Sequence, residues 1–79
     1  SMDRKGLSKI KRAEFLARLD ALERLILEQE ARIATRHARG WDAKESELRL
    51  ELLRESHRLY QSALMHLLGA DFGAAADDA

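Results

Sequence analysis

Large apolar side chains recur along the first half of the chain at intervals of three, four or seven residues, which keeps them on one face of an α-helix. The members of this face are Phe15, Leu19, Leu22, Ile26 and Ile33. Leu16, Leu25 and Leu27 widen the apolar surface on either side. Apolar side chains therefore cover roughly half of the helix circumference, more than the narrow stripe of a two-stranded coiled coil. One neighbouring helix cannot cover so wide a surface.

The second half of the chain carries a similar pattern. The residues predicted to run down the middle of its apolar face are Leu48, Leu52, Leu59, Ala63 and Leu67. Leu53, Tyr60 and Leu64 lie along one side, and Ser56 supplies a small side chain at the centre. Leu50, Met65 and Leu68 fall off the main face, so apolar surface remains exposed after a simple hairpin has closed.

Between the two stretches lies the one credible helix end and restart. Gly40 can adopt the left-handed conformation that ends a helix, and the cations of residues 36–39 suit the negative end of the helix dipole. Asp42, with Glu45 three residues later, is typical of the N-cap and third position of a new helix. The rival interpretation is one continuous helix from about Ser8 to Leu68, which would pair as an extended coiled coil.

The sequence therefore predicts an all-α fold, an antiparallel two-helix hairpin over residues 8–68. Helix 1 is predicted over residues 8–39, the elbow at residues 40–41 and helix 2 over residues 42–68. Residues 1–7 are predicted to form a basic N-terminal arm, in which Ser1 is interpreted as a scar of tag cleavage. Gly69 is expected to end helix 2, and residues 69–79 are expected to form a flexible tail.

A chain of 79 residues without cysteine is short for a stable independent domain and has no disulfide to compensate. Self-association is the remaining source of stability, and the wide apolar faces predict a homodimer in which two hairpins form a four-helix bundle. The predicted dimer core consists of Phe15, Leu19, Leu22, Ile26, Leu52, Leu59, Ala63 and Leu67.

The formal net charge is zero, but its distribution is uneven. Residues 1–40 hold ten Lys and Arg against six Asp and Glu, whereas residues 41–79 hold four against eight. The opposite charges of the two halves favour antiparallel pairing, although exposed ion pairs contribute only about 0–1 kcal/mol each. No apolar run approaches a membrane span, and the lack of cysteine favours a reducing compartment, so a soluble, cytoplasmic protein is expected.

Two polar or aromatic residues leave alternatives open. Gln29 lies within the apolar face of helix 1, where a buried amide can fix the helix register, although an edge position in contact with water is the more ordinary interpretation. Trp41 stands in the elbow beside Arg39, where it can serve as a hydrophobic lid or as a hot spot for a partner.

The sequence offers no pattern for catalysis, metal binding or cofactor binding. His37, His57 and His66 do not have the helical spacing of a chelate, and none completes a Glu-x-x-His pair. There is no Gly-rich phosphate loop, so neither an enzyme nor a cofactor is expected. His57 and His66 fall near opposite edges of the helix 2 face. Each is interpreted as a half-exposed residue at the edge of the apolar face, or alternatively as part of a pH-sensitive interface.

The stretch Leu59-Tyr60-Gln61-Ser62-Ala63-Leu64 is similar to the second helix of the Rop-type plasmid regulators. In that family two helical hairpins dimerise into an antiparallel four-helix bundle that binds RNA through helix 1. The resemblance covers this one short stretch, and the elbow does not match. It implies an analogy of fold and carries over no functional residue.

Two functions fit these observations. The first is a non-enzymatic protein–protein interaction module: a small helical-hairpin adaptor, anti-activator or inhibitor that self-associates. The alternative is a small nucleic-acid-binding regulator that uses the basic arm and helix 1, although a neutral chain with few aromatic residues does not favour it. The candidate partner-binding residues are Arg4, Lys5, Lys9, Lys11, Arg12, Arg36, Arg39 and Trp41.

Overall fold

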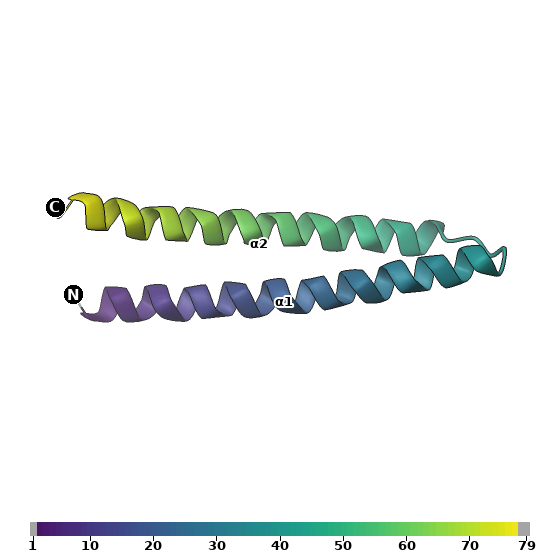
Figure 1. The fold of residues 1–79 in the computed structure, drawn as a ribbon, viewed down its shortest axis with the longest axis horizontal. Coiled ribbons are helices and arrows are strands. Elements are labelled where there is room, and N and C mark those ends of the chain that lie inside the picture. Colours follow the sequence, from purple (N-terminus) through teal and green to yellow (C-terminus); the bar gives the residue numbers. More distant parts are fainter. Residues whose placement is uncertain (1, 78–79) are drawn as a thin grey trace.

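The computed structural model describes the backbone of residues 2–77 and the side chains of residues 9–69. It contains helix α1 (Met2–Ala38) and helix α2 (Lys44–Asp77), and the described residues contain no strand. The two helices lie antiparallel and form a rod with extents of 61 × 17 × 14 Å (Figure 1). The predicted all-α hairpin is thus confirmed, and the single continuous helix is excluded.

The turn between the helices has the hydrogen bonds of a Schellman motif. The Trp41 N–H donates to the Arg36 carbonyl at 2.8 Å, and the Gly40 N–H donates to the His37 carbonyl at 3.0 Å. These two bonds satisfy carbonyls that the end of α1 would otherwise leave unpaired. Gly40 has a φ of 71°, the left-handed conformation predicted for it. The chain can reverse direction here because glycine adopts this conformation at little cost.

Helix α2 begins slightly later than predicted. Its first backbone hydrogen bond runs from the Glu47 N–H to the Ala43 carbonyl at 2.8 Å, which makes Ala43 the N-cap. The prediction of Asp42 as N-cap was therefore wrong by one residue. The side chain of Asp42 still caps the helix, because its Oδ1 accepts a hydrogen bond from the Lys44 N–H at 3.2 Å.

Both helices extend beyond their predicted outer ends. Helix α1 begins at Met2 instead of Ser8, and α2 continues through Gly69 to Asp77 instead of ending at Leu68. The predicted bounds gave too much weight to glycine, which costs a helix only about 1 kcal/mol relative to alanine. The chain has no proline that would stop either helix, and residues 74–76 are alanines, the best helix formers.

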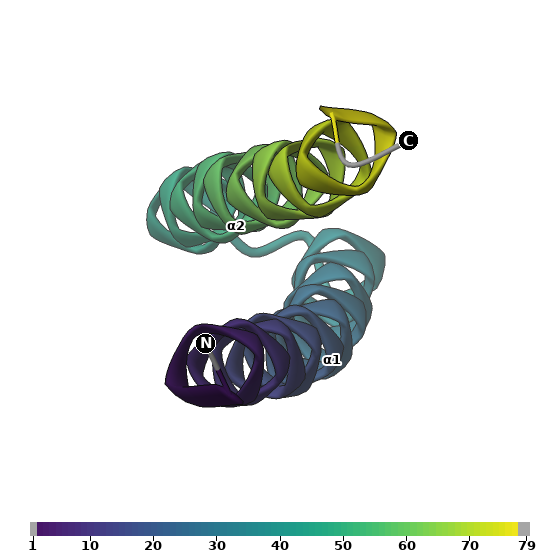
Figure 2. The ribbon, with the colours of Figure 1, turned by 90° about the vertical axis from the view of Figure 1, so that its left-hand side faces the viewer.

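The side chains between the helices follow a seven-residue repeat. Partly or fully buried positions alternate by three and four residues, at 12, 15, 19, 22, 26, 29, 33 and 36 in α1, at the N-cap residue 43, and at 46, 50, 53, 57, 60, 64 and 67 in α2. We call these sixteen positions the seam. This spacing is that of a coiled coil, and the end-on view shows the helices winding past each other (Figure 2). In the seam, the rings of Phe15 and Tyr60 lie 5.8 Å apart.

The seam buries few side chains completely. Among the described residues, only Leu19, Gln29, Ala43 and Leu64 are less than 9% exposed, and no large side chain falls below 2%. The chain exposes 6517 Å², whereas a compact protein of 9.0 kDa exposes about 4,900 Å². Its radius of gyration is 18.0 Å, against about 12 Å for a compact chain of 79 residues. One hairpin alone therefore leaves much of its apolar surface in water.

The two described glycines provide a matched test of the turn. A Cβ would meet no atom within 4 Å at either Gly40 or Gly69, so only backbone conformation separates them. Gly40→Ala should lower the free energy of unfolding by roughly 1–2 kcal/mol, because it forces alanine into the left-handed region. Gly69→Ala should raise it by about 0.5–1 kcal/mol, because Gly69 is helical. Urea unfolding at one fixed protein concentration measures both, and a stabilising Gly40→Ala would contradict the turn.

Candidate interaction surfaces

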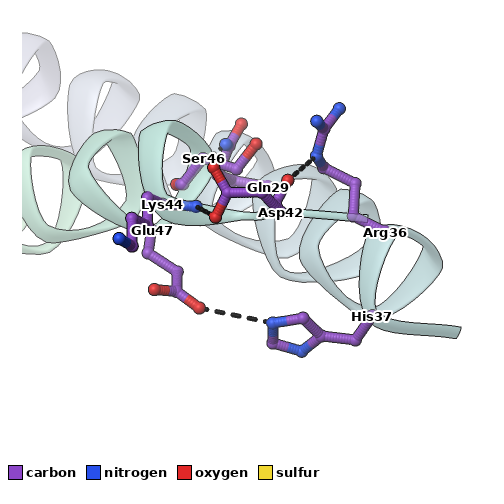
Figure 3. Close-up of polar contacts among 7 residues, drawn as sticks. All are labelled: Gln29, Arg36, His37, Asp42, Lys44, Ser46 and Glu47. Atoms are coloured by element: carbon purple, nitrogen blue, oxygen red, sulfur yellow. Dashed lines mark hydrogen bonds and ion pairs between the residues drawn. The ribbon is translucent and has the colours of Figure 1, made fainter. Parts of the chain in front are cut away.

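Three of the predicted partner-binding residues meet at the elbow. The guanidinium carbon of Arg39 lies 5.0 Å from the centre of the Trp41 ring, and that of Arg36 lies 5.7 Å from it. Both distances are within the range of cation–π attraction. Arg36 Nε also donates a hydrogen bond to the Asp42 carbonyl at 2.6 Å, which ties α1 to the start of α2 (Figure 3).

Trp41 remains 51% exposed in this cluster. The indole packs on the two arginine side chains at the end of α1, and about half of its surface is open to solvent. The elbow is therefore a small, well-defined surface that combines one aromatic ring with two cations, a composition common in interface hot spots.

The basic arm lies at the other end of α1. Arg4 and Lys5 belong to the helix, but their side chains lie outside the described residues. Lys9 and Lys11 are exposed, whereas Arg12 is half-buried in the seam. Lys9 and Arg36 lie 27 positions apart on one helix, which corresponds to roughly 40 Å. The predicted basic residues therefore form two separate groups and not one continuous patch.

Gln29 is buried, at 8% exposure, and its Nε2 donates a hydrogen bond to the Ser46 carbonyl at 2.9 Å. The preferred interpretation of an edge position in contact with water was wrong, and the alternative of a buried amide holds. The bond joins α1 to the first turn of α2, beside the elbow (Figure 3). A polar side chain in a coiled-coil seam favours the register in which it finds its partner.

One side of the hairpin is crossed by three polar pairs between the helices. Their nitrogen–oxygen distances are 3.2 Å for His57 and Glu23, 3.4 Å for Arg54 and Glu30, and 3.4 Å for His37 and Glu47. Glu23, Glu30 and His37 each follow a seam residue of α1 by one position, and Arg54 and Glu47 do the same in α2. Residues that directly follow the seam thus define one side of the hairpin, which we call the paired face.

The residues that directly precede the seam lie on the opposite side, because successive residues of a helix are about 100° apart. In the middle of this side they are small or apolar: Ala21, Leu25, Leu52, Ser56, Leu59 and Ala63. We call these six residues the apolar face. Leu25 is 46% exposed, Leu52 69% and Leu59 63%. On this side Arg18 of α1 stacks over the Tyr60 ring of α2, at 5.6 Å.

The predicted dimer core divides between the seam and this apolar face. Phe15, Leu19, Leu22, Ile26 and Leu67 are seam residues, and Ala63 is half-buried beside the seam. Leu52 and Leu59 are exposed in the single hairpin and are predicted to be buried only in a dimer. The sequence pattern placed them in the middle of the α2 face, whereas α1 covers the adjoining side that carries Leu53, Tyr60 and Leu64. The apolar face consists of the residues that directly precede the seam residues. Fitting a strict seven-residue repeat to the sequence of α2 could have separated these two sets of positions.

The described part of the chain contains no group of three or more His, Asp or Glu side chains that could hold a metal ion. Two surface hollows lie along α2 and are lined by that helix alone. Neither helix has, within the described residues, an apolar stretch long enough to cross a membrane.

Comparison of the chain with protein-family models, with curated proteins and with solved structures found no match.

The elbow yields a test that separates its two arginines. Arg36→Ala removes a stacking contact and the hydrogen bond to the Asp42 carbonyl, so it should lower the free energy of unfolding by about 1 kcal/mol. Arg39→Ala removes only a stacking contact and should cost at most about half as much. Unfolding followed by Trp41 fluorescence measures both variants. An Arg39→Ala variant that is the less stable of the two would contradict the role given to Arg36.

Proposed function

We propose that this protein is a non-enzymatic protein–protein interaction module, a helical hairpin that self-associates through its apolar face and presents its remaining surfaces to a partner protein. The role is that of a small adaptor, anti-activator or inhibitor. The observation that carries the proposal is the uninterrupted row of small and apolar side chains on the apolar face, in which Leu25, Leu52 and Leu59 are exposed. On the paired face polar pairs bridge the helices, and the exposed Leu27 stands between the paired Glu23 and Glu30.

The surface area of the hairpin supports self-association. It exceeds that of a compact chain of the same mass by about 1,600 Å². A standard protein interface buries about 800 Å² per partner, so one interface removes only part of this excess. Apolar side chains also remain exposed elsewhere, since Leu16 is 54% exposed and Met65 64% exposed beside the outer part of the seam. The elbow and this outer region are the surfaces that we assign to a partner protein.

The self-association has a direct test. The wild-type chain should sediment as a dimer at micromolar concentration. Leu59→Glu should yield a helical monomer, because it places a charge in the dimer contact but leaves the seam of each hairpin intact. Sedimentation equilibrium measures the mass, and circular dichroism measures the helix content.

Gln61→Glu is the matched control for this experiment. Gln61 is exposed on α2 two residues from Leu59, and it directly follows the seam, so it lies on the paired face. The same charge there should leave the dimer unchanged. A wild-type chain that is folded and monomeric at this concentration would refute the self-association.

Nucleic-acid binding remains the second candidate, because the cations Lys9 and Lys11 are exposed in the first third of α1. If these residues bind phosphates, affinity for RNA or duplex DNA must fall steeply with salt, and Lys9→Glu with Lys11→Glu must flatten that dependence. We expect only weak, salt-sensitive binding in a gel-shift titration. Tight binding at moderate salt that disappears in the double variant would favour the nucleic-acid function instead.

A further inference from the structure

We infer that the occupant of the apolar face is a second copy of this chain, related by a two-fold axis at the level of Glu23 and Ser56, with α1 packed against α1 and α2 against α2, each antiparallel. This inference rests on the proposed function and specifies the geometry of its dimer. It comes from the order of charged and apolar side chains along the side of the hairpin that carries the apolar face.

Along α2 the residues that precede the seam read from its first turn as Glu45, Arg49, Leu52, Ser56, Leu59, Ala63 and His66. A two-fold axis near Ser56 places Leu52 against Leu59 of the second copy and Ser56 against its own counterpart. The same axis places Glu45 against His66, a carboxylate against an imidazole. The two most exposed leucines of this row therefore cover each other, with the small Ser56 between them at the axis and with Arg49 set against Ala63 farther out.

Along α1 the corresponding row reads Lys11, Glu14, Arg18, Ala21, Leu25, Glu28 and Arg32. A two-fold axis at the level of Glu23 pairs Ala21 with Leu25 of the second copy. It also pairs the charged residues on either side with opposite charges, listed outward from the axis as Arg18 with Glu28 and Glu14 with Arg32. Apolar residues thus meet at the centre, and complementary charges meet at the rim, as in many protein interfaces.

The two rows require the same axis. The contacts of Glu23 with His57 and of Arg18 with Tyr60 place Leu22 near the level of His57. Glu23 of α1 is therefore level with Ser56 of α2. The centre of the α1 charge pattern and the centre of the α2 leucine pattern coincide, although the two rows come from separate parts of the sequence.

Parallel packing of two copies does not fit these rows. It would set Arg18 against Arg18, Glu28 against Glu28 and Glu45 against Glu45. Like charges that directly face one another weaken association. Stacking of α1 over α2 of the second copy fits less well, because it sets Arg18 against Leu59 and leaves the two exposed leucines of α2 apart.

Single cysteines can locate the axis, because the chain has no cysteine of its own. Ser56→Cys should be joined to its counterpart by a short thiol cross-linker on the order of tenfold faster than Gln61→Cys, the control on the paired face, because the axis holds the two thiols at high effective concentration. Arg49→Cys and Ala63→Cys should each cross-link slowly alone and quickly when mixed. Fast cross-linking of Ser56→Cys with Ala21→Cys, but not with itself, would overturn the inference in favour of α1 over α2.

A charge exchange provides an independent readout. Glu14→Arg should weaken the dimer by roughly tenfold, because it converts two attractive pairs into two repulsive ones. Adding Arg32→Glu should restore the dimer. The two positions lie 18 residues, about 27 Å, apart on one helix, so the restoration must act between chains.

The outcomes separate this inference from the proposed function. A wild-type dimer by sedimentation, with slow cross-linking of Ser56→Cys and no restoration by Arg32→Glu, would overturn the geometry and leave the interaction module standing. A folded wild-type monomer would overturn both.

Discussion

A helix that packs against a single neighbour can bury only a narrow stripe of its surface, and this constraint governs the whole molecule. Each helix of the hairpin commits every third or fourth residue to the seam. The leucines beside that seam stay exposed within one hairpin, since the described residues form no third element that could cover them. The hairpin therefore reaches a defined topology with a thin core, and its exposed apolar side chains are the surface through which we propose that it associates.

The elbow and the buried amide near it fix how the two helices face each other. Gly40 reverses the chain, Arg36 joins the end of α1 to the residues before α2, and Gln29 reaches the Ser46 carbonyl. These contacts lie close together at one end of the rod, and they set the register for the remaining seam. A shift of the seam by one residue toward the apolar face would bury the leucines of that face and expose the present seam residues. The local chemistry of the elbow therefore also decides which surface is available for a partner.

Much of this arrangement could be predicted from the sequence. The left-handed glycine, the side-chain cap by Asp42 and the antiparallel hairpin follow from local rules and from apolar spacing. The outer helix ends could not be predicted from glycine alone, because a modest helix penalty was read as a stop. The burial of Gln29 also depends on what lies opposite it, since no local rule shows that α2 offers the Ser46 carbonyl there. Leu52 and Leu59 were correctly recognised as members of an apolar face, but only the structure shows that α1 leaves them exposed.

The central claim is that one hairpin is an incomplete folding unit and that a second copy supplies the missing contacts. The dependence of thermal unfolding on protein concentration tests this most directly, because association with the folded state raises the unfolding midpoint by mass action. Circular dichroism across a hundredfold range of concentration should show the midpoint rising steadily as the chain becomes more concentrated. A midpoint that stays constant over that range, with the helix content unchanged, would show that the hairpin is stable alone and would contradict the account.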